Sequence, residues 1–182
     1  MNSLESDAKD YTSGGADLLR ETSRGMNDED AYEGGGALSG KDYTTTFSVD
    51  QPPEQAFKAI NNPRQWWSDE IKGTTDRVGG VFKYHYEDVH RCKIKVAELI
   101  PGKRVAWEVL DNYFSFTKDK TEWVGTRIAF DIARKSGKTE VRFTHVGLVP
   151  EYECHDVCTD AWGSYIRGSL KKLIEKGEGH PN

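Results

Sequence analysis

The strongest periodic pattern in the chain lies in residues 150–177. Apolar side chains recur there at helical spacing and, with Cys158, form a stripe about 140° wide; they are Trp162, Tyr165, Ile166, Leu170 and Leu173, with Ser169 in the same stripe. Acidic residues lie near the start and basic residues near the end, as the helix dipole favours. The pattern predicts a helix of about five turns that ends at Gly177 and packs on something as broad as a sheet.

Two glycines, Gly163 and Gly168, lie within this predicted helix. Each costs about 1 kcal/mol relative to alanine in a helix interior. Either the backbone approaches a partner closely at these points, or the glycines are neutral because packing holds the helix in any case.

Residues 43–147 alternate between apolar and polar side chains, as strands do. The alternation predicts strands at 43–49, 81–88, 90–99, 103–110, 121–133 and 139–147, with a loop or weak strand at 112–121. A short helix at 53–60 begins with prolines, and a further turn follows at 63–67. The turns between strands are short, so the strands are antiparallel. We therefore expect an α+β fold, with the C-terminal helix covering the apolar face of the sheet.

Large side chains collect on the inward faces of these elements. The candidate ligand contacts are Trp66, Phe82, Tyr84, Tyr86, Trp107, Phe130, Phe143, His145, Trp162, Tyr165 and Ile166. Such a lining suits an apolar or aromatic ligand, but the same residues would also serve as the core of an ordinary domain. Of the Trp66-Trp67 pair, we expect one ring in the core and the other partly exposed.

His145 shares its face with Phe143 and allows three interpretations. It is a polar anchor for a ligand, a general base, or a core histidine paired with a backbone carbonyl or a tyrosine hydroxyl. No acidic residue can be placed beside it, so no catalytic residue is assigned.

The cluster Cys154-His155-x-x-Cys158 contains soft metal ligands. On a helix, however, His155 points about 100° away from Cys154, and a fourth ligand is missing. Neither a phosphate-binding glycine loop nor a nucleophile elbow is present in the sequence. We predict no metal and no other cofactor.

The net charge of −5 is unevenly distributed, with −6 in residues 1–40 and +1 in the rest. Residues 1–41 are rich in Gly, Ser and acids, and we expect a disordered tail. A near-neutral folded part argues against a nucleic-acid-binding surface. Three cysteines favour a reducing, cytoplasmic setting, and the sequence has neither a signal peptide nor an apolar run long enough to span a membrane.

Four motifs in a fixed order resemble a known family. They are Pro53-Glu54-Gln55-Ala56-Phe57, Trp66-Trp67, Gly79-Gly80-Val81-Phe82, and the closing Phe143-Thr144-His145-Val146-Gly147-Leu148. Together they are similar to homologues of the activator of the heat-shock-protein-90 ATPase, within the START-like helix-grip (SRPBCC) superfamily.

The resemblance implies that residues 42–178 form a helix-grip domain, in which a curved antiparallel sheet of about six or seven strands wraps around the C-terminal helix and encloses a cavity. Residues 179–182 would be a flexible end. Members of the superfamily bind lipids, sterols, polyketides and other apolar molecules, and some are enzymes. The eukaryotic activators bind the chaperone with the help of a second domain, which residues 1–40 are too short and too polar to supply.

We therefore expect a non-enzymatic binding protein for a small apolar or aromatic molecule, monomeric or weakly dimeric, with His145 as the polar anchor. Lipid binding and a role in the stress response are implied by the resemblance alone. One alternative is an interaction module that acts on a chaperone ATPase. A less favoured alternative is a cyclase- or hydrolase-type enzyme that uses His145.

Overall fold

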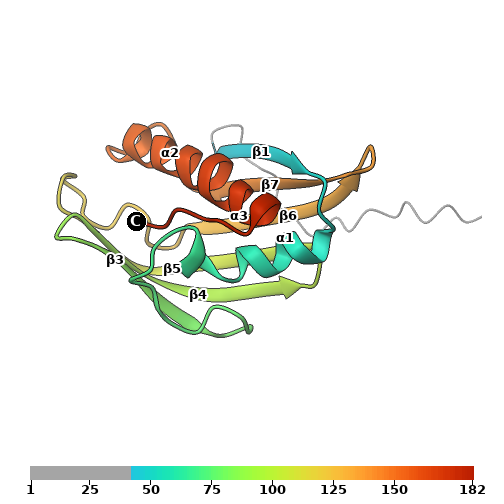
Figure 1. Cartoon of the computed structure of the whole chain (residues 1–182). Coiled ribbons are helices and arrows are strands. Elements are labelled where there is room, and N and C mark those ends of the chain that lie inside the picture. The colour runs from blue at the N-terminus through green and yellow to red at the C-terminus, as the bar shows by residue number, and fades with distance from the viewer. Residues whose placement is uncertain (1–41) are drawn as a thin grey trace, which may run out of the picture. The chain divides into compact units, whose positions relative to one another are not determined.

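An antiparallel sheet of seven strands organises residues 42–182, the part of the chain that this computed structural model describes (Figure 1). The expected tail, residues 1–41, lies outside the described residues. The strand order is β1-β7-β6-β5-β4-β3-β2. Their bounds are β1 Tyr43–Val49, β2 Lys72–Gly73, β3 Val81–Tyr86, β4 His90–Ile100, β5 Arg104–Phe114, β6 Arg127–Lys135 and β7 Lys138–Val146.

The first two strands lie at opposite edges of the sheet, so the chain must cross between them. It crosses as α1 (Pro53–Ile60) and a short 3-10 turn, η1 (Pro63–Gln65). From β2 the chain returns as a meander, and β7 pairs with β1 from Tyr43↔His145 to Val49↔Thr139. The expected turn between β6 and β7 is a two-residue turn in which Ser136 and Gly137 both have positive φ, the geometry that favours a tight hairpin.

The C-terminal helix lies with α1 on one face of the sheet (Figure 1). It has 22 residues, in the segments α2 (His155–Gly163), η2 (Ser164–Leu170) and α3 (Lys171–Lys176). It ends before Gly177, whose φ of 76° is the left-handed cap that the sequence predicted. The predicted α+β helix-grip fold is confirmed. The 3.6-residue pattern did not predict that the middle segment, η2, is a π-helix.

The two glycines of this helix have different surroundings. A Cβ on Gly163 would lie 3.3 Å from the Arg167 Nη2 and 3.6 Å from the Tyr43 hydroxyl, whereas a Cβ on Gly168 would meet nothing within 4 Å. Of the two glycines, only Gly163 therefore lies where the helix backbone comes close to neighbouring side chains.

Sheet curvature comes partly from β4. The β4–β5 register shifts twice, between Lys93 and Ile94 and between Val96 and Glu98. Such bulges bend a strand and increase its twist. The bent sheet curves around the helix, which buries its apolar stripe, including Trp162, Ile166 and Leu170.

Both rings of the Trp66-Trp67 pair lie in the core, at 0% and 2% exposure, so the expectation of one partly exposed ring is wrong. Trp67 is stacked on Trp107 of β5 at a centroid distance of 6.2 Å and contacts Trp162 of α2 at 5.0 Å. The sheet and the helix thus cover this ring from two sides.

The boundaries around residues 110–126 also differ from the prediction. β5 continues to Phe114, and β6 begins at Arg127 in place of residue 121. The alternation changes phase within β5, since Val109 is buried, Leu110 and Asp111 are exposed, and Asn112 and Phe114 are buried again. The loop that follows is closed by hydrogen bonds from Phe114 N to Lys120 O at 3.0 Å and from Thr126 N to Trp123 O at 3.0 Å.

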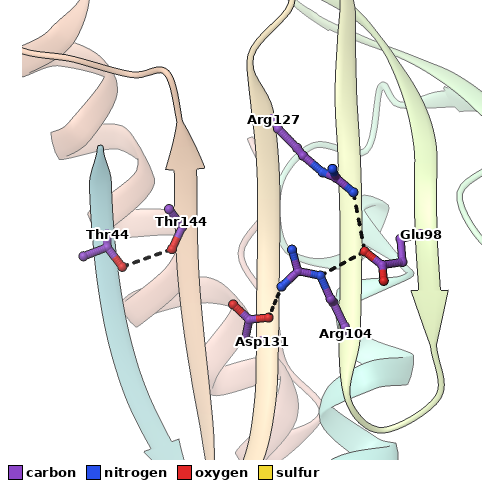
Figure 2. A network of polar contacts seen from close by, with 6 residues as sticks. All are labelled: Thr44, Glu98, Arg104, Arg127, Asp131 and Thr144. Carbon is purple, nitrogen blue, oxygen red and sulfur yellow. Dashed lines mark hydrogen bonds and ion pairs between the residues drawn. The ribbon is translucent and has the colours of Figure 1, made fainter. Parts of the chain in front are cut away.

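The face of the sheet opposite the helices carries a polar network across β4, β5 and β6 (Figure 2). Arg104 donates from Nε to Glu98 Oε2 at 2.9 Å and from Nη1 to Asp131, while Arg127 Nη2 reaches the same Glu98 oxygen at 3.4 Å. At the β1 edge of the sheet, the hydroxyls of Thr44 and Thr144 are 3.2 Å apart and join β1 to β7. These side chains hold strand neighbours together away from the helix-covered face.

Candidate binding cavity

A cavity of about 150 Å³ lies where the C-terminal helix meets one end of the sheet. It is lined by residues of β3, β4, β5, α2 and η2, of the turn between β3 and β4, of the loop after β5 and of the turn after η1. The lining residues are Trp67, Tyr84, Tyr86, Val89, His90, Phe114, Phe116, Trp123, Val157, Cys158, Ala161, Trp162 and Tyr165.

The cavity has a buried floor and an exposed rim. Tyr84, Trp123 and Trp162 are each no more than 4% exposed, whereas Tyr86 and Phe116 are 40% and 45% exposed and Val157 is 59% exposed. The rim residues therefore surround an opening to solvent, and the space between sheet and helix is reachable from outside.

Two neighbouring turns build the rim. Glu87, with φ of 46°, turns the chain between β3 and β4, and Tyr86 pairs with His90 across this hairpin. The loop after β5 then docks beside it, because Ser115 N donates to Val89 O at 2.9 Å. This contact brings Phe114 and Phe116 to the same opening as Tyr86.

None of the residues lining the cavity is Asp, Glu, Lys or Arg. The polar groups of the lining side chains are the hydroxyls of Tyr84, Tyr86 and Tyr165, the His90 imidazole, the Cys158 thiol and the indole N–H groups of Trp67, Trp123 and Trp162. Burial raises the pKa of Tyr84, and the neighbouring Tyr165 adds to this shift, so Tyr84 stays neutral at pH 7. The lining thus presents no formal charge at neutral pH and disfavours an ionised ligand.

His90 is held by a relay of hydrogen bonds. Asn112 Nδ2 donates to Lys120 O at 3.2 Å, which leaves Asn112 Oδ1 as the acceptor for His90 Nε2 at 3.0 Å. Burial lowers the pKa of His90 to about 4, so at pH 7 the ring is neutral. The proton lies on Nε2, and Nδ1 keeps its lone pair.

His145 lies in the core behind the cavity and uses both of its ring nitrogens. Trp162 Nε1 donates to His145 Nδ1 at 3.1 Å, so Nε2 carries the proton and donates to Thr126 Oγ1 at 2.9 Å. That hydroxyl donates onward to Trp123 O at 2.6 Å. Burial, and next the proximity of His90, lower the pKa of His145 to about 3. Its partners are an indole and a threonine hydroxyl, not the backbone carbonyl or tyrosine hydroxyl that we expected for a core histidine.

The predicted contact residues divide into two layers. Tyr84, Tyr86, Trp162 and Tyr165 line the cavity. The others, each 0% exposed, form the core behind it: Trp66, Phe82, Trp107, Phe130, Phe143, His145 and Ile166.

Nine of the lining residues were not among the contacts predicted from the sequence, although the strand alternation places one of them, His90, on the inward face. In the alternation of β4, His90 lies on the same face as Cys92, Ile94 and Val96, which are buried. Phe114 lies beyond the phase change in β5, and Trp123 lies in a loop, where alternation says nothing. The remaining six are Trp67, Val89, Phe116, Val157, Cys158 and Ala161.

The cysteine cluster lies at the start of α2. Cys154 and Cys158 are buried, while His155 Nδ1 pairs with the exposed Asp156 carboxylate at 2.9 Å. Within residues 42–182, no three side chains of the His, Cys, Asp and Glu types come close enough together to hold a metal ion. The Glu122 carboxylate accepts from Glu153 N at 2.7 Å and from Cys154 N at 3.0 Å, the two N–H groups that come immediately before the first helical residue, His155.

A family model described as "Activator of Hsp90 ATPase homolog 1-like protein" matches residues 50–175. The chain belongs to this family. The match begins just before α1 and ends within α3, so it includes every element that lines the cavity. The family and its fold support a module that binds a ligand or a partner. No match was found among the curated proteins.

Solved structures agree with this assignment. The solution structure of the Aha1 dimer from Colwellia psychrerythraea is 26% identical, with a TM-score of 0.62 over 76% of this chain and 98% of that one. Protein MLL2253 from Mesorhizobium loti is 14% identical, with a TM-score of 0.60 over 74% and 96%. Protein CV1439 from Chromobacterium violaceum is 19% identical, with a TM-score of 0.54 over 74% and 97%. The last two show the fold alone.

None of the helices in residues 42–182 combines the length and the apolar character needed to cross a bilayer.

Proposed function

We propose that this member of the family is a non-enzymatic binding protein that holds a small uncharged apolar or aromatic ligand in the cavity between β3, β4 and α2. The observation that carries the proposal is a solvent-accessible cavity whose floor is aromatic and whose lining has no ionised side chain. Buried apolar side chains and a few neutral polar atoms are what small-molecule sites use for affinity and orientation.

Cavity size limits the ligand. A volume of about 150 Å³ is that of an apolar cavity known to bind benzene, and it is smaller than the roughly 300–1,000 Å³ of drug-sized sites. One ring or the end of a short chain fits inside. Any further part of the molecule would lie over the rim formed by Tyr86, Phe116 and Val157.

The side chains give more support to binding than to catalysis. His90 and Tyr84 are both neutral at pH 7, with pKa values far from neutrality, so neither is suited to exchange a proton there. His145 is fully buried and hydrogen-bonded at both nitrogens. A cyclase or hydrolase reaction with His145 as base therefore has no free proton acceptor at this position.

The proposal is tested by adding toluene, phenol and benzoate to the ¹⁵N-labelled full chain and recording the indole signals of Trp67, Trp123 and Trp162. Binding should shift these three signals in a saturable way. Ala161→Phe fills the cavity from α2 and should weaken binding at least tenfold. Ser164→Phe, a matched control on the same helix with an exposed side chain outside the lining, should bind normally. If no probe shifts any of the three signals, the proposal fails.

A second candidate is a protein-interaction module, with the rim as its contact surface. The exposed apolar side chains of Tyr86, Phe116 and Val157 favour it, because grouped exposed apolar residues mark interaction sites. The family and the dimeric Colwellia structure add support, and we propose a monomer or a weak dimer. Phe116→Ser should weaken self-association in sedimentation equilibrium or abolish capture of purified Hsp90. A variant that behaves like the parent chain in both assays excludes this use of the rim.

The three cysteines, Cys92, Cys154 and Cys158, are free and buried. We propose that the protein works in a reducing compartment, the cytoplasm, where thiols persist without disulfides. The lipid-binding and stress-response roles suggested by the resemblance depend on the ligand and partner experiments above.

A further inference from the structure

His90, one of the residues that line the cavity, carries a hydrogen-bond acceptor whose protonation state the protein controls, its Nδ1 atom. The Lys120 carbonyl can only accept, so it fixes which end of the Asn112 amide faces it, and Asn112 Oδ1 in turn fixes the proton on His90 Nε2. The backbone of the loop after β5 thus determines the tautomer of a side chain in the cavity lining.

Nδ1 is left without a partner among residues 42–182, since Asn112 is bonded to the other nitrogen. It is not one of the buried polar atoms that lack a hydrogen bond, so water reaches it. Those atoms include the indole nitrogens of Trp66, Trp107 and Trp123, which water does not reach. His90 is one of the residues that line the cavity, and Nδ1 is its ring nitrogen without a hydrogen-bond partner among residues 42–182.

The plane of the imidazole is fixed by three aromatic contacts. Its centroid lies 5.0 Å from Tyr84, 4.3 Å from Phe114 and 4.8 Å from Trp123, with the Tyr84 and Trp123 rings packed edge to face. A ligand therefore meets an acceptor of set direction in otherwise mostly apolar surroundings, and this is the arrangement that distinguishes ligands by their donors.

We propose that His90 determines the specificity of this cavity, and that the ligand class is an uncharged aromatic ring carrying one O–H or N–H donor, such as a phenol or an indole, that is hydrogen-bonded to Nδ1. This proposal rests on the proposed function of the cavity. A ring without a donor, such as toluene, displaces the water from Nδ1 and leaves this nitrogen without a hydrogen bond. A benzoate brings a charge that the lining cannot compensate.

The test compares phenol, toluene and benzoate at pH 7 on the full chain. The measured quantity is the ratio of the toluene Kd to the phenol Kd, in the parent chain and in His90→Phe. Removing the acceptor should lower this ratio about tenfold, the value of one net hydrogen bond. His85→Phe is the matched control, because His85 is on β3, pairs with Glu70 at 2.9 Å and does not line the cavity. This control should keep the parent ratio.

A direct measurement covers the case in which His90→Phe does not fold. In the parent chain, the ¹⁵N signal of His90 Nδ1 should move downfield, toward the value of a nitrogen without a hydrogen bond, when toluene displaces its water. It should stay at the value of a hydrogen-bonded nitrogen when phenol binds, because the phenol hydroxyl replaces the water as donor. Equal responses to the two rings, an unchanged ratio in His90→Phe, or benzoate binding as tight as phenol binding would overturn the proposal while the cavity remains a binding site. Absence of binding by all three probes refutes the proposed function and this proposal with it.

Discussion

At the residue scale, His145 connects the helix to the sheet through polar atoms inside an apolar core. Its two nitrogens join Trp162 of α2 to Thr126 beside β6, and Thr126 continues to the Trp123 carbonyl. Every donor in this relay has one acceptor, so burial leaves none of these groups unpaired. The indoles of Trp123 and Trp162, both on the cavity floor, are stacked at a centroid distance of 5.8 Å beside it.

His145→Leu should lower the free energy of unfolding by about 2–4 kcal/mol, because the Trp162 N–H would be buried without an acceptor and the Thr126 hydroxyl would lose the hydrogen bond that it accepts. His145→Gln retains a donor and an acceptor and should lose less. Urea denaturation followed by circular dichroism measures both. His85→Leu, at an exposed position, is the control and should change the free energy by less than about 0.5 kcal/mol. Equal losses of free energy in the Leu and Gln variants would show that His145 stabilises the fold through the packing of its ring and not through its hydrogen bonds.

At the element scale, the start of α2 is stabilised from outside the helix. The Cys154 side chain makes no capping bond at the N-cap position. Glu122, a buried carboxylate in the loop after β5, accepts two backbone N–H groups there. A negative charge at a helix N-terminus is also favoured by the helix dipole. The loop that forms part of the cavity wall therefore also anchors the helix that forms the opposite wall.

Glu122→Ala should destabilise the domain by about 2–3 kcal/mol, since two hydrogen bonds to a charged group are lost. Hydrogen exchange should show the largest loss of protection in the first turn of α2. Glu153→Ala is the control, because that partly exposed carboxylate bonds Lys118 N and not the helix. Unchanged protection in α2 of Glu122→Ala would contradict the role of Glu122 as a cap.

At the scale of the whole molecule, two buried histidines make stability depend on pH. The ordinary histidine pKa is 6.5, and in the folded chain it falls to about 4 for His90 and about 3 for His145, in each case mainly because of burial. Below pH 6.5 the unfolded chain therefore binds protons that the folded chain does not. The stability that comes from keeping these two histidines neutral in the folded chain is complete above pH 6.5. It is lost progressively as the pH falls toward 4 for His90 and toward 3 for His145.

Between pH 6 and pH 4.5 the free energy of unfolding should fall by about 1.4 kcal/mol per pH unit for each of the two histidines. Urea titrations at several pH values measure this slope. His145→Gln removes one titrating group and should reduce the slope by the contribution of one histidine, about 1.4 kcal/mol per pH unit. A slope that is the same in the two proteins would mean that His145 is not held neutral by the fold.

The sequence by itself determined the fold class and most of the elements, but not the short strand β2 or the π-helical segment η2. The 3.6-residue stripe from Cys158 to Leu173 predicted the C-terminal helix, alternation predicted the sheet, and Gly177 predicted the helix end. These properties are local, because a hydrophobic period and a cap depend on residues within a few positions of one another. The motif order from Pro53 to Leu148 likewise indicated the family that the model match confirmed.

Only the tertiary structure decided where the core ends and the cavity begins. Tyr84 and Phe82 share a strand face, yet one lines the cavity and the other does not. Phe114, Phe116 and Trp123 reach the cavity through a phase change in β5 and a folded loop, and no period in the sequence encodes these features. The tautomers of His90 and His145 depend on Lys120, Trp123 and Trp162, which are distant in the chain. Packing between distant segments sets these contacts, so they follow from the assembled sheet and helix and not from any local pattern.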